Sequence, residues 1–125
     1  MRHIWKNLAP NLIRQRIIIE ATTTNFIDNK VMISKYLKQL TKIVGMTAMR
    51  DPFVYTAHED GYGAWQHWKT SGASFYTYPA RKGDPCLITL DCYTCKPFNS
   101  KKAVLFTKHF FNTIEIVWKE IKILP

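Results

Sequence analysis

The stretch "SGASFYTYPARKGDPCLITLDCYTC", residues 71–95, decides the fold of this 125-residue chain. It holds two runs rich in β-branched and aromatic residues, Ala73–Pro79 and Cys86–Cys95, joined by a turn signal that contains Gly83. Such runs, separated by a short connection with glycine and proline, predict two neighbouring strands. Ser71 then stands just before one strand and Cys95 ends the next.

Outward from this pair, further strands and two helices are predicted. The additional strands are Arg14–Thr24, Pro52–His58, Ala64–Lys69 and Glu115–Leu124. One helix follows Asp28 or Asn29 and stops at Gly45, and its apolar face is Met32, Ile33, Tyr36, Leu37, Leu40, Ile43 and Val44. A second helix is capped by Asn99 or Ser100, and its face is Ala103, Phe106, Thr107, Phe110 and Ile114.

The order strand, helix, several strands, helix, strand lacks the strict βαβ alternation of a parallel sheet. It predicts an α+β fold: a two-layer α/β sandwich with a mostly antiparallel sheet and two helices on one face. The length suits a single domain. Residues 1–13 read as an irregular arm whose apolar residues could pack against a surface.

Composition excludes several classes of protein. With 46% hydrophobic and 22% charged residues, the chain reads as globular rather than disordered. Its apolar runs are too short to cross a bilayer, and the N-terminus lacks the apolar core of a secretory signal. Three cysteines without an export signal indicate reduced thiols and a cytoplasmic protein. Cys92 and Cys95 form a lone C-x-x-C without a second ligand pair, so no metal site is expected.

The net charge of +9 raises the question of an anionic partner. Nucleic-acid binding is one interpretation. The basic residues are spread along the chain, however, and no RNA-binding or helix-turn-helix motif accompanies them. A solvated basic surface is therefore the preferred interpretation, and nucleic acid is not an expected partner.

Residue types alone favour no active site. Gly72 after Ser71 is typical of a turn, and the G-x-S-x-G motif of hydrolases is absent. The spacing of His58 and His67 does not indicate a catalytic triad. Cys95 could be a small packed hydrophobe.

Two motifs considered together are more informative than the single residues. They are Thr77-Tyr78-Pro79 and, after it, Asp91-Cys92-Tyr93-Thr94-Cys95. These motifs resemble the processing and catalytic segment of the prokaryotic-type pyruvoyl-dependent S-adenosylmethionine decarboxylase family. Counting back places Ser71 on the family's processed serine, and Cys95 falls on its catalytic cysteine. The motifs cover roughly residues 68–98, and the element order agrees over most of residues 14–125, the expected family domain.

This resemblance implies a self-processing enzyme. The chain would split between Thr70 and Ser71, and Ser71 would become an N-terminal pyruvoyl cofactor. The pyruvoyl ketone would form a Schiff base with S-adenosylmethionine and act as an electron sink as carbon dioxide leaves. Cys95 would reprotonate the α-carbon. The product, decarboxylated S-adenosylmethionine, would feed spermidine synthesis.

Three positions depart from the family pattern. Thr70 replaces a glutamate, Gly72 a histidine, and Tyr76 the histidine that assists processing. A tyrosine hydroxyl is a weak base, with an ordinary pKa near ~10, but it can donate or accept a hydrogen bond. We therefore expect Tyr76 to take the histidine's place as a catalytic residue. If Ser71 stays a serine instead, the chain is a non-catalytic binding or partner subunit.

The resemblance also implies a homodimer with sites near its interface. Glu20 stands where the family often has an acidic residue, and it could neutralise a cationic substrate or simply face solvent. The adenine would stack on an aromatic ring, for which Phe53, Tyr55 and Trp65 are available. A pyruvoyl decarboxylase of another amino acid, ornithine or arginine, is the alternative enzyme.

Overall fold

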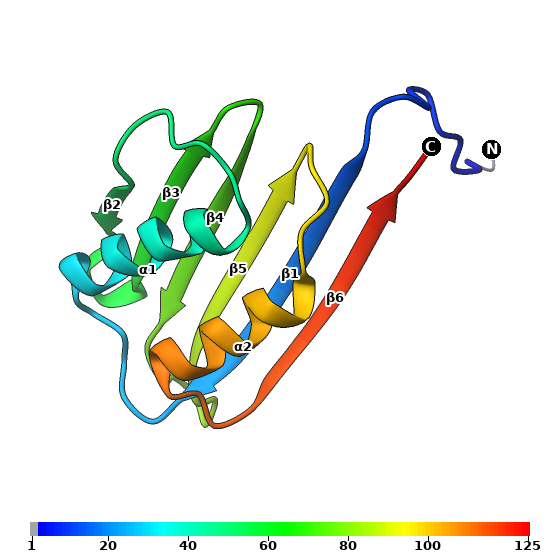
Figure 1. Cartoon of the computed structure of the whole chain (residues 1–125). Helices are drawn as coiled ribbons and strands as arrows, with labels where there is room; N and C mark the ends of the chain where they lie inside the picture. The colour runs from blue at the N-terminus through cyan, green and yellow to red at the C-terminus, as the bar shows by residue number, and fades with distance from the viewer. Residues whose placement is uncertain (1–2) are drawn as a thin grey trace.

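The computed structural model describes residues 3–125, and the chain folds into one sheet and two helices (Figure 1). The strands are β1 (Arg14–Thr23), β2 (Phe53–Thr56), β3 (Tyr62–Trp68), β4 (Ser71–Tyr78), β5 (Cys86–Thr94) and β6 (Ile116–Ile123). The helices are α1 (Lys30–Ile43) and α2 (Ser100–Phe111), with a short 3-10 turn, η1, at His58–Asp60. Of the predicted arm, residues 1 and 2 lie outside the described residues, and residues 3–13 contain neither helix nor strand.

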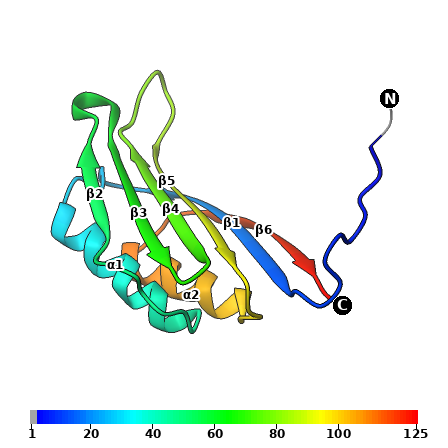
Figure 2. The same ribbon diagram turned by 90° about the horizontal axis from the view of Figure 1, so that it is seen from above.

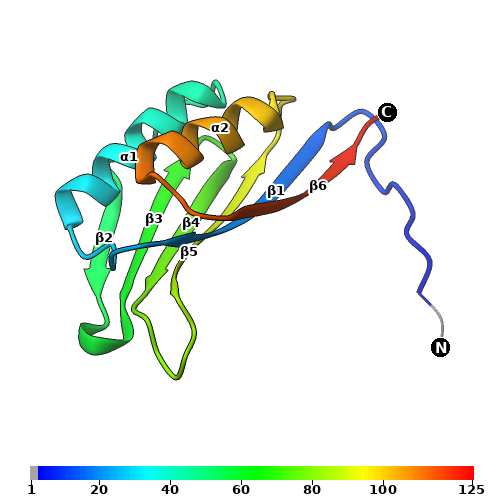
Figure 3. The same cartoon turned by 90° about the horizontal axis from the view of Figure 1, so that it is seen from below.

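The six strands form a single sheet in the order β2-β3-β4-β5-β1-β6, and every neighbouring pair is antiparallel. Both helices lie side by side on the same face of this sheet (Figures 1 and 3). The predicted two-layer α+β sandwich is therefore confirmed.

Alternation along the strands divides the sheet into two faces. In β1, Ile17 and Ile19 are buried under the helices, whereas Ile18 and Glu20, which alternate with them, are exposed. We call the second face the open face, because no helix covers it (Figure 2). Its exposed apolar residues are Ile18, Phe53, Tyr55, Trp65, Tyr76, Tyr78, Tyr93, Val117 and Ile121.

The helix faces follow the predicted spacing with two corrections. The side chain of Asn29 caps α1 by accepting a hydrogen bond from the Met32 amide at 3.0 Å. Met32, in the first turn, is 36% exposed, so its assignment to the buried face was wrong. Ile114 is 67% exposed because α2 ends at Phe111 and Asn112 turns the chain with a φ of 49°, after which helical spacing no longer applies.

Tyr36 is the centre of the core between the helices and the sheet. It is fully buried, and its ring packs against four phenylalanine rings at centroid distances of 4.7–5.4 Å: Phe75, Phe106, Phe110 and Phe111. Its hydroxyl lies 2.8 Å from the Thr107 hydroxyl, so the one polar atom of the side chain is satisfied. Burial raises the pKa of Tyr36 and keeps the hydroxyl neutral.

Truncation of Tyr36 should therefore separate ring packing from the hydroxyl's hydrogen bond. We expect Tyr36→Ala to lower the free energy of unfolding by about 3–5 kcal/mol and Tyr36→Phe by about 1 kcal/mol. Val31→Ala, at a position 78% exposed in the same helix, should change it by less than about 0.5 kcal/mol. Urea unfolding followed by circular dichroism measures all three. Equal losses for the two Tyr36 variants would contradict the packing role of the ring.

Candidate active site at the β4–β5 edge

The turn between β3 and β4 presents the predicted cleavage site. Only Lys69 and Thr70 connect the two strands, and Thr70 has a φ of 63°. A β-branched residue rarely adopts this left-handed conformation, and two-residue hairpins normally place glycine or asparagine there. The peptide bond before Ser71 therefore follows a residue held in an unfavourable backbone conformation. Ser71 opens β4 and is partly exposed.

A second set of contacts fixes the loop after β5 that carries Cys95. Thr94 is buried beneath the helices, and its hydroxyl donates to the Lys96 carbonyl at 2.6 Å. The buried side-chain amide of Gln15 binds the same loop through both its nitrogen and its oxygen. It donates to the Phe98 carbonyl at 2.9 Å and accepts from the Phe98 amide at 2.9 Å. Cys95 is thus held at the strand end by buried side chains of β1 and β5.

The antiparallel pairing of β4 with β5 brings Ser71 and Cys95 together. The Cys95 amide donates to the Ser71 hydroxyl oxygen at 3.0 Å, and the Cys95 Sγ lies 3.0 Å from the Thr70 hydroxyl oxygen. The sequence indicates Thr70 as the residue before the cleaved bond and as the replacement of the family's glutamate, but not as a contact of the thiol. Its contact with the thiol depends on the left-handed turn, which no motif in the sequence signals.

The three thiols of the chain have different environments. Hydrogen bonds from the hydroxyls of Thr70 and then Ser71 lower the pKa of the partly exposed Cys95 thiol below its ordinary value. Burial, and then the nearby Asp91, raise the pKa of the Cys92 thiol to about 12. Cys86 is also buried. Of the three thiols, that of Cys95 combines partial exposure with a lowered pKa, which suits it to proton transfer.

Tyr76 lies far from Ser71 in the same chain. The two residues are five positions apart along β4, which corresponds to about 17 Å at ~3.3 Å per residue. Tyr76 is on the open face, where its register partners are Gly63 of β3 and Thr89 of β5. A general base must come within about 3 Å of its proton, so Tyr76 cannot serve the Ser71 of its own chain.

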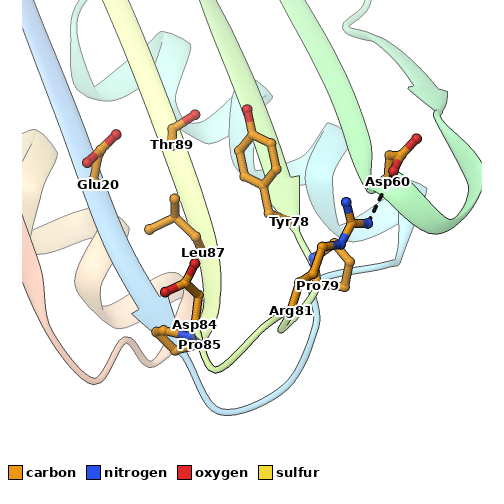
Figure 4. Close-up of a pocket in the computed structure, with 9 residues that line it drawn as sticks. All are labelled: Glu20, Asp60, Tyr78, Pro79, Arg81, Asp84, Pro85, Leu87 and Thr89. Atoms are coloured by element: carbon orange, nitrogen blue, oxygen red, sulfur yellow. Dashed lines mark hydrogen bonds and ion pairs between the residues drawn. The ribbon is translucent and has the colours of Figure 1, made fainter.

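Glu20 belongs with Tyr76 rather than with Ser71. It lies within β1, opposite Thr89, and therefore in the same cross-strand row of the open face as Tyr76. It lines a pocket of about 520 Å³ with Tyr78, Leu87 and the turn before β5 (Figure 4). In that turn, Arg81 pairs with Asp60 at 3.1 Å.

The aromatic candidates for adenine stacking are all exposed on the open face. Phe53 and Tyr55 contact each other with ring centroids 6.1 Å apart, and Trp65 lies 4.9 Å from the ring of His67. His67 is opposite Gly72, one register position from Ser71, whereas His58 lies in η1. Neither His58 nor His67 forms a hydrogen bond with Ser71.

No group of three or more His, Cys, Asp or Glu side chains within residues 3–125 is arranged to hold a metal ion. Neither helix in this range is long and apolar enough to span a membrane.

The fold and the paired serine and cysteine define a two-layer α+β domain whose candidate active site lies at the adjacent ends of β4 and β5. A model of the S-adenosylmethionine decarboxylase family matches residues 15–122, so the chain belongs to that family. The crystal structure of the adenosylmethionine decarboxylase from Aquifex aeolicus VF5 is similar over 92% of this chain and 93% of that one, with a TM-score of 0.72 and 18% identity. A comparison with curated proteins yields no match.

The environments of the thiols predict an order of chemical modification. Iodoacetamide reacts with thiolates, so a lowered pKa favours reaction at the partly exposed Cys95, whereas Cys92 has a raised pKa and both Cys86 and Cys92 are buried. We expect Cys95 to be alkylated at least roughly tenfold faster than the other two at neutral pH. Peptide mass spectrometry over a time course and a pH series measures this. Faster labelling of Cys92 would show that the Cys95 thiol is not activated.

Proposed function

We propose that this chain is a self-processing, pyruvoyl-dependent decarboxylase of S-adenosylmethionine. The observation that carries the proposal is the 3.0 Å hydrogen bond between the Cys95 amide and the Ser71 hydroxyl. It joins the two residues that match the family's processed serine and catalytic cysteine, in a chain that belongs to the family. Cleavage between Thr70 and Ser71 would convert Ser71 into the pyruvoyl group, and the product would serve spermidine synthesis.

The residues around Ser71 fit such a group. Ser71 is partly exposed at the end of a hairpin, so substrate can approach it, and the Cys95 loop is fixed by buried contacts. The pyruvoyl group supplies an electron sink for loss of the substrate carboxylate. Cys95 would deliver the proton that the substrate α-carbon receives, because its amide contacts the Ser71 hydroxyl, its thiol lies at Thr70, and its lowered pKa makes the thiol a readier proton donor.

The same proposal includes a homodimer formed through the open face. That face exposes several aromatic and aliphatic side chains, which is typical of an interaction surface. Pairing two open faces would cover these side chains. It would also allow Tyr76 and Glu20 of one chain to approach the Ser71 edge of the other, which they cannot reach within one chain. In this arrangement Tyr76 assists the elimination that releases the Thr70 carboxylate.

The first test is the intact mass of the purified protein under denaturing conditions. We expect two fragments, residues 1–70 and 71–125, with the second lighter by one ammonia than a fragment that begins with serine. Ser71→Ala should remain a single chain. Incubation of the cleaved protein with carboxyl-labelled S-adenosylmethionine should then release labelled carbon dioxide.

The replacement of the processing histidine by Tyr76 keeps two other functions in view. Cleaved protein that releases carbon dioxide from ornithine or arginine, and not from S-adenosylmethionine, would establish the alternative decarboxylase. A parent chain that stays intact after prolonged incubation would instead establish a non-catalytic subunit that binds a ligand or pairs with an active partner.

The dimer has its own test. We expect light scattering to give the mass of two chains for the parent protein and of one chain for Trp65→Glu, which places a charge on the open face. Leu105→Glu is the matched control, because Leu105 is 52% exposed on α2 and Trp65 is 48% exposed. A monomeric parent, or equal dissociation of both variants, would contradict an interface on the open face.

A further inference from the structure

Self-cleavage must begin with removal of a proton from the Ser71 hydroxyl, and the residues near that hydroxyl are few. The imidazole expected from the family is replaced by Tyr76, which lies about 17 Å away along its own strand. His67 faces Gly72, but its ring contacts Trp65. The Cys95 amide contacts the Ser71 hydroxyl at 3.0 Å, its thiol lies 3.0 Å from the adjacent Thr70 hydroxyl, and Ser71 is among the groups that lower the pKa of this thiol.

We propose that Cys95 is the base that starts cleavage of the Thr70–Ser71 bond, and that the Thr70 hydroxyl positions its thiol for this step. The inference rests on the proposed self-processing and adds to the later role of Cys95 as proton donor. The Cys95 amide donates a hydrogen bond to Ser71 Oγ. The hydroxyl proton of Ser71 therefore points away from that amide. Cys95 Sγ lies 3.0 Å from Thr70 Oγ1, directly beside the bond to be cleaved.

The step balances without an oxidant or a cofactor. The Ser71 hydroxyl proton moves to the Cys95 sulfur as Ser71 Oγ forms a bond to the Thr70 carbonyl carbon. The carbon–nitrogen bond between Thr70 and Ser71 then breaks, and the thiol returns the proton to the Ser71 nitrogen. The product is an ester that joins the Thr70 carbonyl to Ser71 Oγ and carries a free Ser71 amine.

The Thr70 hydroxyl can serve the thiol in both protonation states. It lies 2.6 Å from the Lys69 carbonyl and 3.0 Å from Cys95 Sγ, but it has a single proton to donate. When the thiol is protonated, the thiol donates to Thr70 Oγ1 and Thr70 donates to Lys69. When the thiol is ionised, the Thr70 proton turns toward sulfur. This rotation stabilises the thiolate and is unavailable to a side chain without a hydroxyl.

Four variants separate this role from its rivals. Cys95→Ala removes the base, and Thr70→Val removes the hydroxyl while keeping a β-branched side chain in the left-handed turn. Thr70→Ser restores the hydroxyl. His67→Gln removes the neighbouring imidazole and leaves the rest of the turn unchanged. Cleavage is followed by intact mass across a pH series, and each variant is also treated with hydroxylamine, which splits an ester and leaves an amide intact.

The Cys95 and Thr70 variants have distinct expected results, and His67→Gln should cleave at the parent rate. Cys95→Ala should cleave roughly 10²- to 10⁴-fold more slowly and should resist hydroxylamine, because no ester forms. Thr70→Val should cleave roughly 10- to 100-fold more slowly, and Thr70→Ser should recover the parent rate. The pH midpoint for both cleavage and Cys95 alkylation should rise in Thr70→Val, since loss of the hydroxyl removes the largest cause that lowers the thiol's pKa.

Other outcomes overturn the inference. A Cys95→Ala chain that cleaves at the parent rate, or that accumulates a hydroxylamine-sensitive ester, would show that another group starts the reaction. A slow His67→Gln beside a normal Cys95→Ala would assign the step to the imidazole. An unchanged alkylation profile in Thr70→Val would remove Thr70 from the mechanism. A parent chain that never cleaves overturns both this inference and the proposed function, whereas cleavage independent of Cys95 overturns the inference alone.

Discussion

The antiparallel register between β4 and β5 is the constraint on which the candidate site depends. It pairs Ala73 with Cys92 and thereby places the start of β4 beside the end of β5. A slip of one residue would turn Phe75 and Leu90 from the helix-covered core to the open face. Burial of these side chains therefore fixes the register, and the register fixes the distance between Ser71 and the Cys95 loop.

The two faces of the sheet have different tasks. The covered face supplies stability, since its strand residues pack against Tyr36 and the phenylalanines around it. It also supports the candidate site, because Thr94 and Gln15 are buried on this face and anchor the loop after β5 that carries Cys95. The open face carries exposed aromatic residues that the fold of one chain does not need. The candidate site is thus anchored by buried contacts at the Cys95 loop, whereas Ser71 is partly exposed to solvent.

The strands, both helices and the two-layer fold could be predicted from the sequence because their apolar periodicity agrees with burial. The prediction failed at Met32 and Ile114, where a helix end interrupts that periodicity. The proximity of Ser71 and Cys95 could be inferred from neighbouring strands. The contact of Thr70 with the thiol could not, because it depends on a left-handed turn at a residue that normally avoids one.

Position also limits what Tyr76 and Glu20 can do. Glu20 stands where the family often has an acidic residue, and Tyr76 stands where it has a histidine. Both lie in one cross-strand row of the open face, and Tyr76 is five residues from Ser71 along β4. Proton transfer does not cross such a distance, so within one chain they contribute nothing to the cleavage step. Any catalytic part for them requires a second copy that turns its open face toward the first. The proposed first step of cleavage at the hairpin, by contrast, needs only groups that one chain already brings together.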